Sequence, residues 1–181
     1  MRKRFLLITS YLLLVTALCG CGYTTRSMIT NKYHTIYITP FVNKTDITNE
    51  AYTGSQYRIY IPHLETDITN AVINKFLTDG NLKPVQEPNA DLILKGELVD
   101  FHRDPLRYDN SKNVLEYRLS PVINMSLWDT KENKLLYQEN NFTGDTTYYT
   151  SGTTAISESA AVNNALVDLA RRVVERAVDQ W

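Results

Sequence analysis

Both cysteines of the 181-residue chain lie within its first 21 residues, and this constrains most strongly how the rest can fold. No disulfide can form beyond residue 21, so the remaining ~160 residues must be held together by a hydrophobic core. The chain starts with Arg2, Lys3 and Arg4, and residues 5–18 are largely apolar and uncharged. This order is typical of an export signal. As a helix, residues 5–18 would span ~21 Å, less than the ~30 Å hydrocarbon core of a bilayer.

The four residues that follow this stretch, Leu18-Cys19-Gly20-Cys21, resemble the lipobox of bacterial lipoproteins. The resemblance implies cleavage before Cys21, a diacylglycerol on its sulfur and a fatty acyl chain such as palmitate on its new amine. Several acyl chains anchor a protein firmly, whereas one alone is marginal. Residues 1–20 are therefore expected to be a signal peptide, 21–33 a lipidated tether and 34–181 a single domain. Gly22 stands where Asp would imply retention at the inner membrane, so the expected location is the periplasmic side of the outer membrane.

Two other interpretations of the first residues stay open. The uncharged stretch continues to Thr25, which would suit an uncleaved N-terminal anchor. The Cys19-Gly-Cys21 pair could also bind metal or act in redox chemistry. With no other cysteine in the chain and no nearby histidine, however, two thiolates form an incomplete zinc site.

The charge balance argues against nucleic acid as a partner. Nineteen lysines and arginines face twenty aspartates and glutamates, but three of the cations belong to the leader. Without them, sixteen cations face twenty anions, a net charge of −4. Such a domain lacks the basic excess needed to follow a phosphate backbone.

Hydrophobic periodicity predicts two amphipathic helices and five strands in the order βαββββα. The first helix opens at Pro62, carries apolar residues from Leu64 to Phe76 and ends with a C′ glycine at Gly80. The second is expected over about residues 154–181. Its apolar stripe comprises Ile156, Ala160, Leu166, Leu169, Ala170, Val173 and Ala177, and its solvent side comprises Arg171, Arg172, Glu175 and Arg176.

The strands are expected at residues 34–43, 82–86, 90–102, 114–128 and 135–142. Pro121 cannot donate to a strand ladder, so its strand should carry a bulge there or lie at a sheet edge. Residues 44–61, 103–113 and 143–153 are predicted to be loops, and the first of them is longer than packing requires. The simplest fold is α+β: a two-layer sandwich with both helices on one face of a mixed sheet of about four to five strands.

The usual parts of an enzyme are missing from the sequence. The three histidines, His34, His63 and His102, are far apart and belong to no metal motif, and neither G-x-S-x-G nor a glycine-rich phosphate loop occurs. We therefore expect no catalytic residue, metal or cofactor. Six tyrosines fall in or beside predicted loops, where strand preference does not explain them and where they suit a wet interface or a sugar-rich ligand. They are Tyr52, Tyr57, Tyr60, Tyr108, Tyr148 and Tyr149.

Several segments in the same order together resemble the lipopolysaccharide-assembly lipoprotein family, LptE. They are residues 21–23 (Cys-Gly-Tyr), 36–45, 64–76, 90–97, 105–109 (Pro-Leu-Arg-Tyr-Asp), 127–129 (Leu-Trp-Asp) and 168–171 (Asp-Leu-Ala-Arg). The resemblance implies a non-enzymatic helix-and-sheet plug inside the LptD β-barrel translocon, which helps to assemble that barrel and contacts lipopolysaccharide during its delivery to the outer leaflet. The loop at residues 46–61 is longer than usual for the family, so no contact is transferred to it. The alternative is another envelope lipoprotein scaffold, for example an activator of peptidoglycan synthesis, with no lipopolysaccharide role.

Six cations at predicted strand ends and loops are the candidate ligand-binding residues, since Arg and Lys suit the phosphates of lipid A. They are Arg103, Arg107, Lys112, Arg118, Lys131 and Lys134. We expect them to be grouped at one set of strand ends. The alternative for each is an ordinary solvated surface charge.

Overall fold

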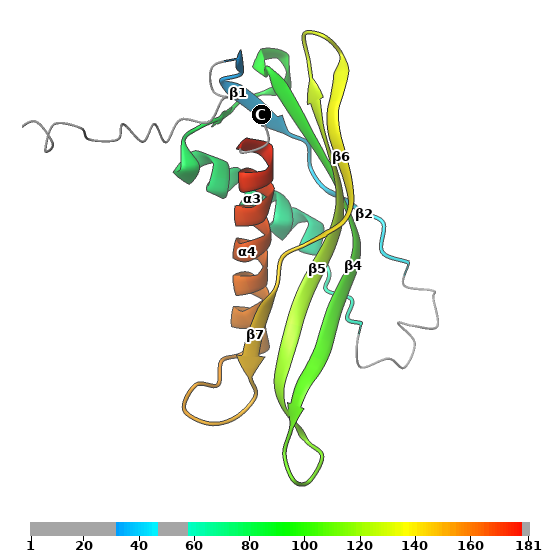
Figure 1. The fold of residues 1–181 in the computed structure, drawn as a ribbon, viewed down its shortest axis with the longest axis vertical. Helices are drawn as coiled ribbons and strands as arrows, with labels where there is room; N and C mark the ends of the chain where they lie inside the picture. The colour runs from blue at the N-terminus through cyan, green and yellow to red at the C-terminus, as the bar shows by residue number, and fades with distance from the viewer. Residues whose placement is uncertain (1–31, 47–57, 179–181) are drawn as a thin grey trace, which may run out of the picture.

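A computed structural model describes residues 32–46 and 58–178 of the chain (Figure 1). The predicted signal peptide, Cys21, Tyr52 and Tyr57 lie outside the described residues. The expected α+β architecture is confirmed, because two helices pack against one face of a curled mixed sheet. Tyr33, which the sequence assigns to the tether, is 5% exposed and belongs to the core.

Within the described residues the sheet has seven strands: five follow the order β3-β1-β4-β5-β6, while β2 pairs with β4 and β7 pairs with β5. Their bounds are β1 Thr35–Ile38, β2 Val42–Asn43, β3 Lys83–Pro84, β4 Leu92–Tyr108, β5 Val114–Asp129, β6 Lys134–Thr143 and β7 Thr146–Tyr149. β1 is parallel to β3 and β4, and β2 is parallel to β4. β4, β5 and β6 form an antiparallel meander, and β7 also pairs with β5. Parallel and antiparallel pairs together make the sheet mixed, as expected.

The expected strand over residues 34–43 is divided into β1 and β2. The backbone N–H of Phe41 donates to Thr69 Oγ1 at 2.9 Å, and that hydroxyl donates to the Glu65 carbonyl at 2.7 Å. The chain therefore leaves the ladder to contact a helix, and Pro40 is exposed. Phe41 points into the core against Gly96, where a Cβ atom would lie 2.1 Å from a ring carbon.

Two predicted loops are partly strand. β4 continues through Arg103 to Tyr108, so the predicted loop at 103–113 is wrong except for its last residues. There the Asp109 carboxylate accepts the N–H groups of Ser111 and Asn113 and closes the turn. β7 lies within the predicted loop at 143–153. Local sequence does not show either extension, because both depend on pairing with β5.

Pro121 lies in a central strand, so of the two expected alternatives, a bulge or a sheet edge, the edge is wrong. On one side, residues 116–119 of β5 pair with β7 and residues 122–129 pair with β6. Ser120 and Pro121 lie between these two paired segments. A register shift in β4 between Leu98 and Asp100 lies opposite. The missing donor is thus accommodated by an interruption of the neighbouring ladder.

Two helices, α3 (Leu64–Asp79) and α4 (Glu158–Val178), cover the sheet. α3 ends as predicted, with Gly80 at φ 78° and its N–H donating to the Phe76 carbonyl. α4 begins later than predicted, because the Ser157 hydroxyl accepts the N–H of Ala160 and caps it. Ile156 is 40% exposed and Ala160 is also exposed, so neither belongs to the apolar stripe.

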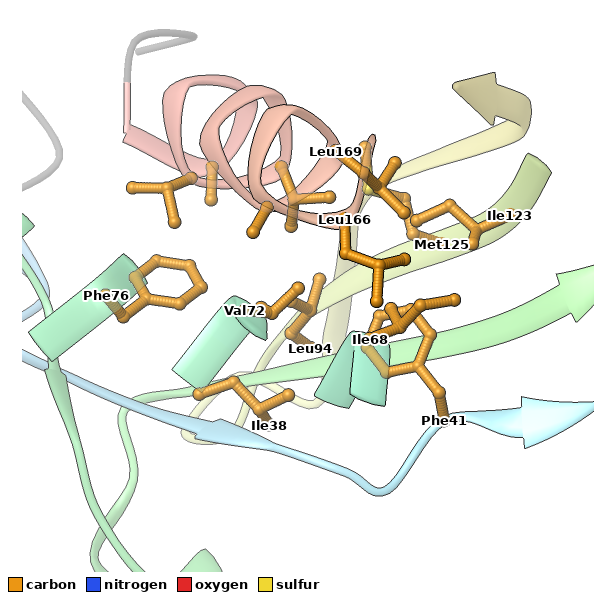
Figure 2. Close-up of a cluster of buried hydrophobic side chains, with 14 of the residues drawn as sticks. Ile38, Phe41, Ile68, Val72, Phe76, Leu94, Ile123, Met125, Leu166 and Leu169 are labelled. Atoms are coloured by element: carbon orange, nitrogen blue, oxygen red, sulfur yellow. The ribbon is translucent and has the colours of Figure 1, made fainter. Parts of the chain in front are cut away.

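The core lies between these helices and β1, β4 and β5 (Figure 2). Ile68, Val72 and Phe76 of α3 and Leu166 and Leu169 of α4 all belong to this cluster. The sheet side of the core comes from alternate residues of the strands, including Ile38, Leu94, Ile123 and Met125. The predicted stripes are thus confirmed as core, apart from the first turn expected of the second helix.

Candidate functional site

One end of the molecule gathers arginines and tyrosines, and we call it the hairpin end. It comprises the β4–β5 hairpin from Arg103 to Arg118 together with β7, at the bottom of Figure 1. Leu106 and Tyr108, near the turn, are 42% and 50% exposed. The expectation that Tyr108 would be a surface tyrosine is confirmed.

The helix-facing side of the hairpin end is closed. The Arg103 guanidinium lies 5.1 Å from the Tyr117 ring centroid, and its Nη1 is 3.2 Å from Glu158 Oε2. Tyr148 stacks on Tyr117 with centroids 5.8 Å apart and donates its hydroxyl to Glu158 Oε2 at 3.2 Å. Burial and the Glu158 charge raise the pKa of Tyr148 to about 12. Tyr148 is therefore a core residue that orders Arg103 and not the loop tyrosine predicted from sequence.

The outer side of the hairpin end is open to solvent. The Arg107 side chain is 61% exposed, with Nη2 3.5 Å from Glu116 Oε2 and the guanidinium 5.8 Å from the Tyr149 ring centroid. Arg118 and Lys112 are exposed, and neither has an ion-pair partner among residues 32–46 and 58–178. This side can offer three cations and two tyrosine rings, at residues 108 and 149, to an anionic ligand.

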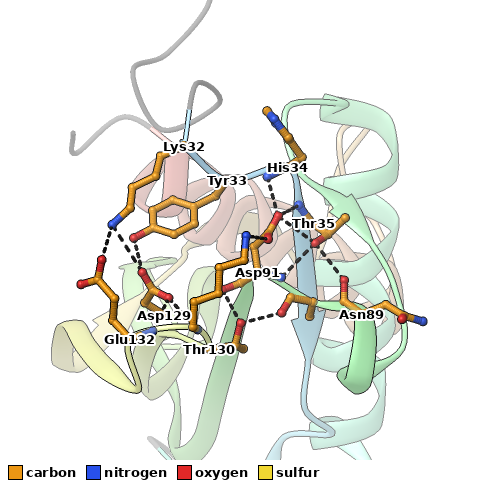
Figure 3. Close-up of polar contacts among 11 residues, drawn as sticks. Lys32, Tyr33, His34, Thr35, Asn89, Asp91, Asp129, Thr130 and Glu132 are labelled. Atoms are coloured by element: carbon orange, nitrogen blue, oxygen red, sulfur yellow. Dashed lines mark hydrogen bonds and ion pairs between the residues drawn. The ribbon is translucent and has the colours of Figure 1, made fainter.

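The opposite end, which we call the turn end, holds the β5–β6 turn, β3 and the start of β1. Figure 3 shows its polar network. Tyr33 donates its hydroxyl to Asp129 Oδ2 at 2.6 Å, and Lys32 Nζ bridges Asp129 and Glu132 at 3.5 and 3.1 Å. Burial opposes ionisation of Asp129, but hydrogen bonds from Tyr33 and from the backbone N–H groups of residues 131 and 132 lower its pKa below the usual range.

A second carboxylate, Asp91, binds the first strand at the same end. Its Oδ2 accepts the N–H of His34, the N–H of Thr35 and the Thr35 hydroxyl at 3.0, 3.2 and 3.0 Å. Lys131 Nζ is 2.7 Å from Asp91 Oδ1. Lys131 and these donors hold the pKa of Asp91 well below its ordinary value.

The six candidate cations do not share one end, which corrects the predicted grouping. Arg103, Arg107, Lys112 and Arg118 belong to the hairpin end, whereas Lys131 and Lys134 lie at the turn end. β5, which joins the two ends, has 16 residues and so spans roughly 50 Å. The two groups lie at opposite ends of this one long strand. Residues that are close in the sequence, such as Arg118 and Lys131, are therefore far apart in space.

The sequence pattern does not single out the turn-end residues Tyr33 and Asp129. A weak signal was present, because Asp followed by Thr-Lys-Glu suits a turn in which the carboxylate accepts the N–H two residues ahead. Nothing in the pattern indicates that Tyr33 is its second partner, 96 residues away in the sequence.

α4 is tied to β6 and β7 by charges that the sequence assigned to solvent. Arg172 Nη2 is 2.8 Å from Asp145 Oδ1, and Arg176 pairs with Glu139 on β6. Asp168 accepts the backbone N–H of Asp145 at 3.0 Å. Of the predicted solvent side, Glu175 is exposed, while Arg172 and Arg176 link the helix to the sheet.

A groove of about 860 Å³ runs between the outer faces of the helices, with apolar residues such as Ala71 and Leu166 and a rim of Asn70, Asn74 and Asn163.

The His102 Nε2 atom lies 3.2 Å from Asp100 Oδ2, and Arg58 Nη2 lies 3.1 Å from the same oxygen. Within residues 32–46 and 58–178, no cluster of three or more acidic, His or Cys side chains has a metal-binding arrangement. No helix in this part of the chain combines the length and hydropathy of a membrane span.

Comparisons with known proteins support the fold and show a family. A family model described as LptE, lipopolysaccharide-assembly, matches residues 33–181. No curated protein matches the sequence significantly. A solved structure of protein XCC0632 from Xanthomonas campestris is similar, with a TM-score of 0.55, 11% identity, and coverage of 81% of this chain and 87% of that one.

Two further structures share the fold. A hypothetical protein from Chlamydia trachomatis gives a TM-score of 0.53 at 12% identity, over 80% of this chain and 95% of that chain. An uncharacterized lipoprotein B from Nitrosomonas europaea gives 0.52 at 15% identity, over 87% and 90% of the two chains.

Proposed function

The chain belongs to the LptE family of lipopolysaccharide-assembly proteins, and from that premise we propose that it is a lipid-anchored plug of an LptD-type β-barrel in the outer membrane. In this role it helps the barrel to assemble and assists delivery of lipopolysaccharide to the outer leaflet. It acts without catalysis or a cofactor. Cys21 carries the lipid, residues 1–20 are its signal peptide, the residues from Cys21 up to the start of the body at Lys32 are the tether, and the body lies on the periplasmic side.

The observation that carries the proposal is the family match over residues 33–181, which spans the folded body. The surface agrees with it. The sheet face away from the helices presents Lys95, Glu97, Ser126 and Gln138 around a shallow pocket of about 390 Å³. A body inside a barrel needs such a hydrogen-bonding surface, because barrel interiors are polar.

We assign the lipopolysaccharide contact to the hairpin end. Arg107, Lys112 and Arg118 are exposed there beside Tyr108 and Tyr149, and Arg pairs with phosphate through two parallel hydrogen bonds. Arg103 supports this surface from within, since Glu158 and Tyr117 already engage it. Lys131 and Lys134 lie at the other end and serve a different purpose.

Co-purification tests the proposed function. The full chain with a C-terminal tag is extracted in mild detergent, and the proteins that remain bound are identified by mass spectrometry. We expect a large β-barrel protein in near-equal amount, which an unrelated tagged lipoprotein from the same cells should not retain. Recovery without any barrel would contradict the plug and favour another envelope scaffold.

A further inference from the structure

The start of the folded chain is fixed to the turn end by hydrogen bonds from consecutive residues. Lys32 and Tyr33 reach Asp129, while His34 and Thr35 reach Asp91 (Figure 3). Asp129 is buried, with a side chain 1% exposed. The point at which the chain enters the body is therefore held on the same side as the β5–β6 turn.

The chain ahead of Lys32 is short compared with the body. Ten residues lie between Cys21 and Lys32, and even fully extended this segment reaches only ~40 Å. β4, with 17 residues, alone spans roughly 55 Å from the turn end to the hairpin end. A lipid on Cys21 therefore keeps the turn end near the membrane, while the hairpin end is free to extend much farther away.

The charges of the turn end favour a surface of lipid phosphates. Lys32 and Lys131 are 59% and 72% exposed, whereas their partners Asp129 and Asp91 are 1% and 17% exposed. Lys83, whose Cα pairs with Thr35, and Lys134, whose Cα pairs with Asp129, are exposed at the same end. The cations thus point outward, and two of the three carboxylates that pair with Lys32 and Lys131, Asp129 and Asp91, lie beneath them, while the third, Glu132, is 55% exposed.

We propose that this lysine rim, formed by Lys32, Lys83, Lys131 and Lys134, lies against the headgroup phosphates of the membrane that anchors the chain, with the hairpin end directed away from it. The proposal rests on the lipidation of Cys21 in the proposed function. Lysine binds phosphate as a mobile point charge and is attracted to an anionic lipid surface. The body then has two functional ends, one for the anchoring membrane and one for the ligand.

Fluorescence quenching tests this orientation. Both native cysteines lie before residue 22, one of them removed with the signal and the other acylated, so an introduced cysteine is the only free thiol. The full lipidated chain, with any protein that co-purifies, carries a fluorophore on Glu87→Cys at the turn end or on Asn110→Cys at the hairpin end. It is reconstituted into phosphatidylethanolamine and phosphatidylglycerol vesicles that contain a lipid with a nitroxide on its headgroup. We expect at least several-fold stronger quenching at residue 87.

The double substitution Lys83→Glu with Lys134→Glu tests the rim itself. It should remove most of the difference in fluorescence quenching between the probes at residues 87 and 110. The matched control, Lys44→Glu with Asn163→Asp and Asn164→Asp, makes the same change in net charge at exposed positions away from the turn end and should preserve this difference. Equal quenching of both probes in the unsubstituted protein overturns the orientation alone. A chain that does not stay with the vesicles overturns the lipidation and the proposal together.

Discussion

At the residue scale, Asp91 shows how one carboxylate can fix the start of a strand, here β1. It accepts three hydrogen bonds from His34 and Thr35 and pairs with Lys131 at 2.7 Å. All of these partners favour the ionised form, and the pKa of Asp91 is accordingly depressed. Ionisation of this group is therefore coupled to folding.

The sign of the coupling gives a pH prediction. A depressed pKa contributes stability that is fully present above the unfolded value of ~3.9 and is lost as pH falls through that value toward the folded one. The asparagine side chain of Asp91→Asn cannot ionise and so loses the interactions of the charged carboxylate. At pH 7 this substitution should lower the free energy of unfolding by ~1–3 kcal/mol. Below about pH 4 the difference from wild type should shrink. Urea unfolding followed by circular dichroism at several pH values measures this.

The matched control is Glu87→Gln, at an exposed carboxylate near the same end. It should leave the stability curve almost unchanged. A difference between Asp91→Asn and wild type that stayed constant from pH 7 to pH 3 would show that the residue acts through packing alone.

At the element scale, two glycines allow close approach between segments. A Cβ atom on Gly96 of β4 would lie 2.1 Å from the Phe41 ring, and one on Gly144, between β6 and β7, would lie 2.3 Å from the Leu169 backbone nitrogen. Neither glycine has the positive φ that favours this residue type in turns. Each is needed for space, but one neighbour is a side chain and the other is the main chain of α4.

This difference predicts that a second substitution relieves the overpacking at Gly96 but not at Gly144. Gly96→Ala and Gly144→Ala should each destabilise the fold by ~1–3 kcal/mol or more through overpacking. Phe41→Leu should then cost less in the Gly96→Ala background than in wild type, because it makes room for the new methyl group. Leu169→Ala should bring no such gain beside Gly144→Ala. Double-mutant cycles in urea measure both couplings, and similar couplings in the two cycles would contradict this account.

The observed bounds of the helices and strands show which elements the local sequence pattern can predict. α3 was predicted with its stripe and its terminal glycine, because three-to-four spacing and a C′ glycine are local features. The sequence pattern does not predict β7 or residues 103–108 of β4, since neither alternates strongly and both form against β5. Tyr148 was misassigned for the same reason: its burial comes from Tyr117 and α4.

At the scale of the whole molecule, the long β4–β5 pair separates two charged ends. Each candidate cation can therefore contact a ligand only at the end where its strand places it. We predict that Arg107→Glu with Arg118→Glu weakens lipopolysaccharide binding about tenfold or more, equivalent to at least ~1.4 kcal/mol. The loss should be largest at low salt, because exposed charges are screened as ionic strength rises. Retention of labelled lipopolysaccharide by the purified full chain is the measurement.

The comparison variant is Lys83→Glu with Lys134→Glu, which makes the same change in net charge at the other end. It should keep at least most of the affinity. If both double variants lost affinity equally, binding would follow net charge and the hairpin end would have no special role.

The sequence by itself determined the α+β class, the two core stripes, the Gly80 helix end and the family, because these depend on periodicity, turn chemistry and the order of short segments. The tertiary structure alone decided that the six candidate cations divide between two ends, that Tyr148 is buried, and that Arg172 and Arg176 join α4 to the sheet. These properties depend on which strands pair and how long they run. Charge and burial act through distances in space, and only the fold sets those distances between residues that are far apart in the chain.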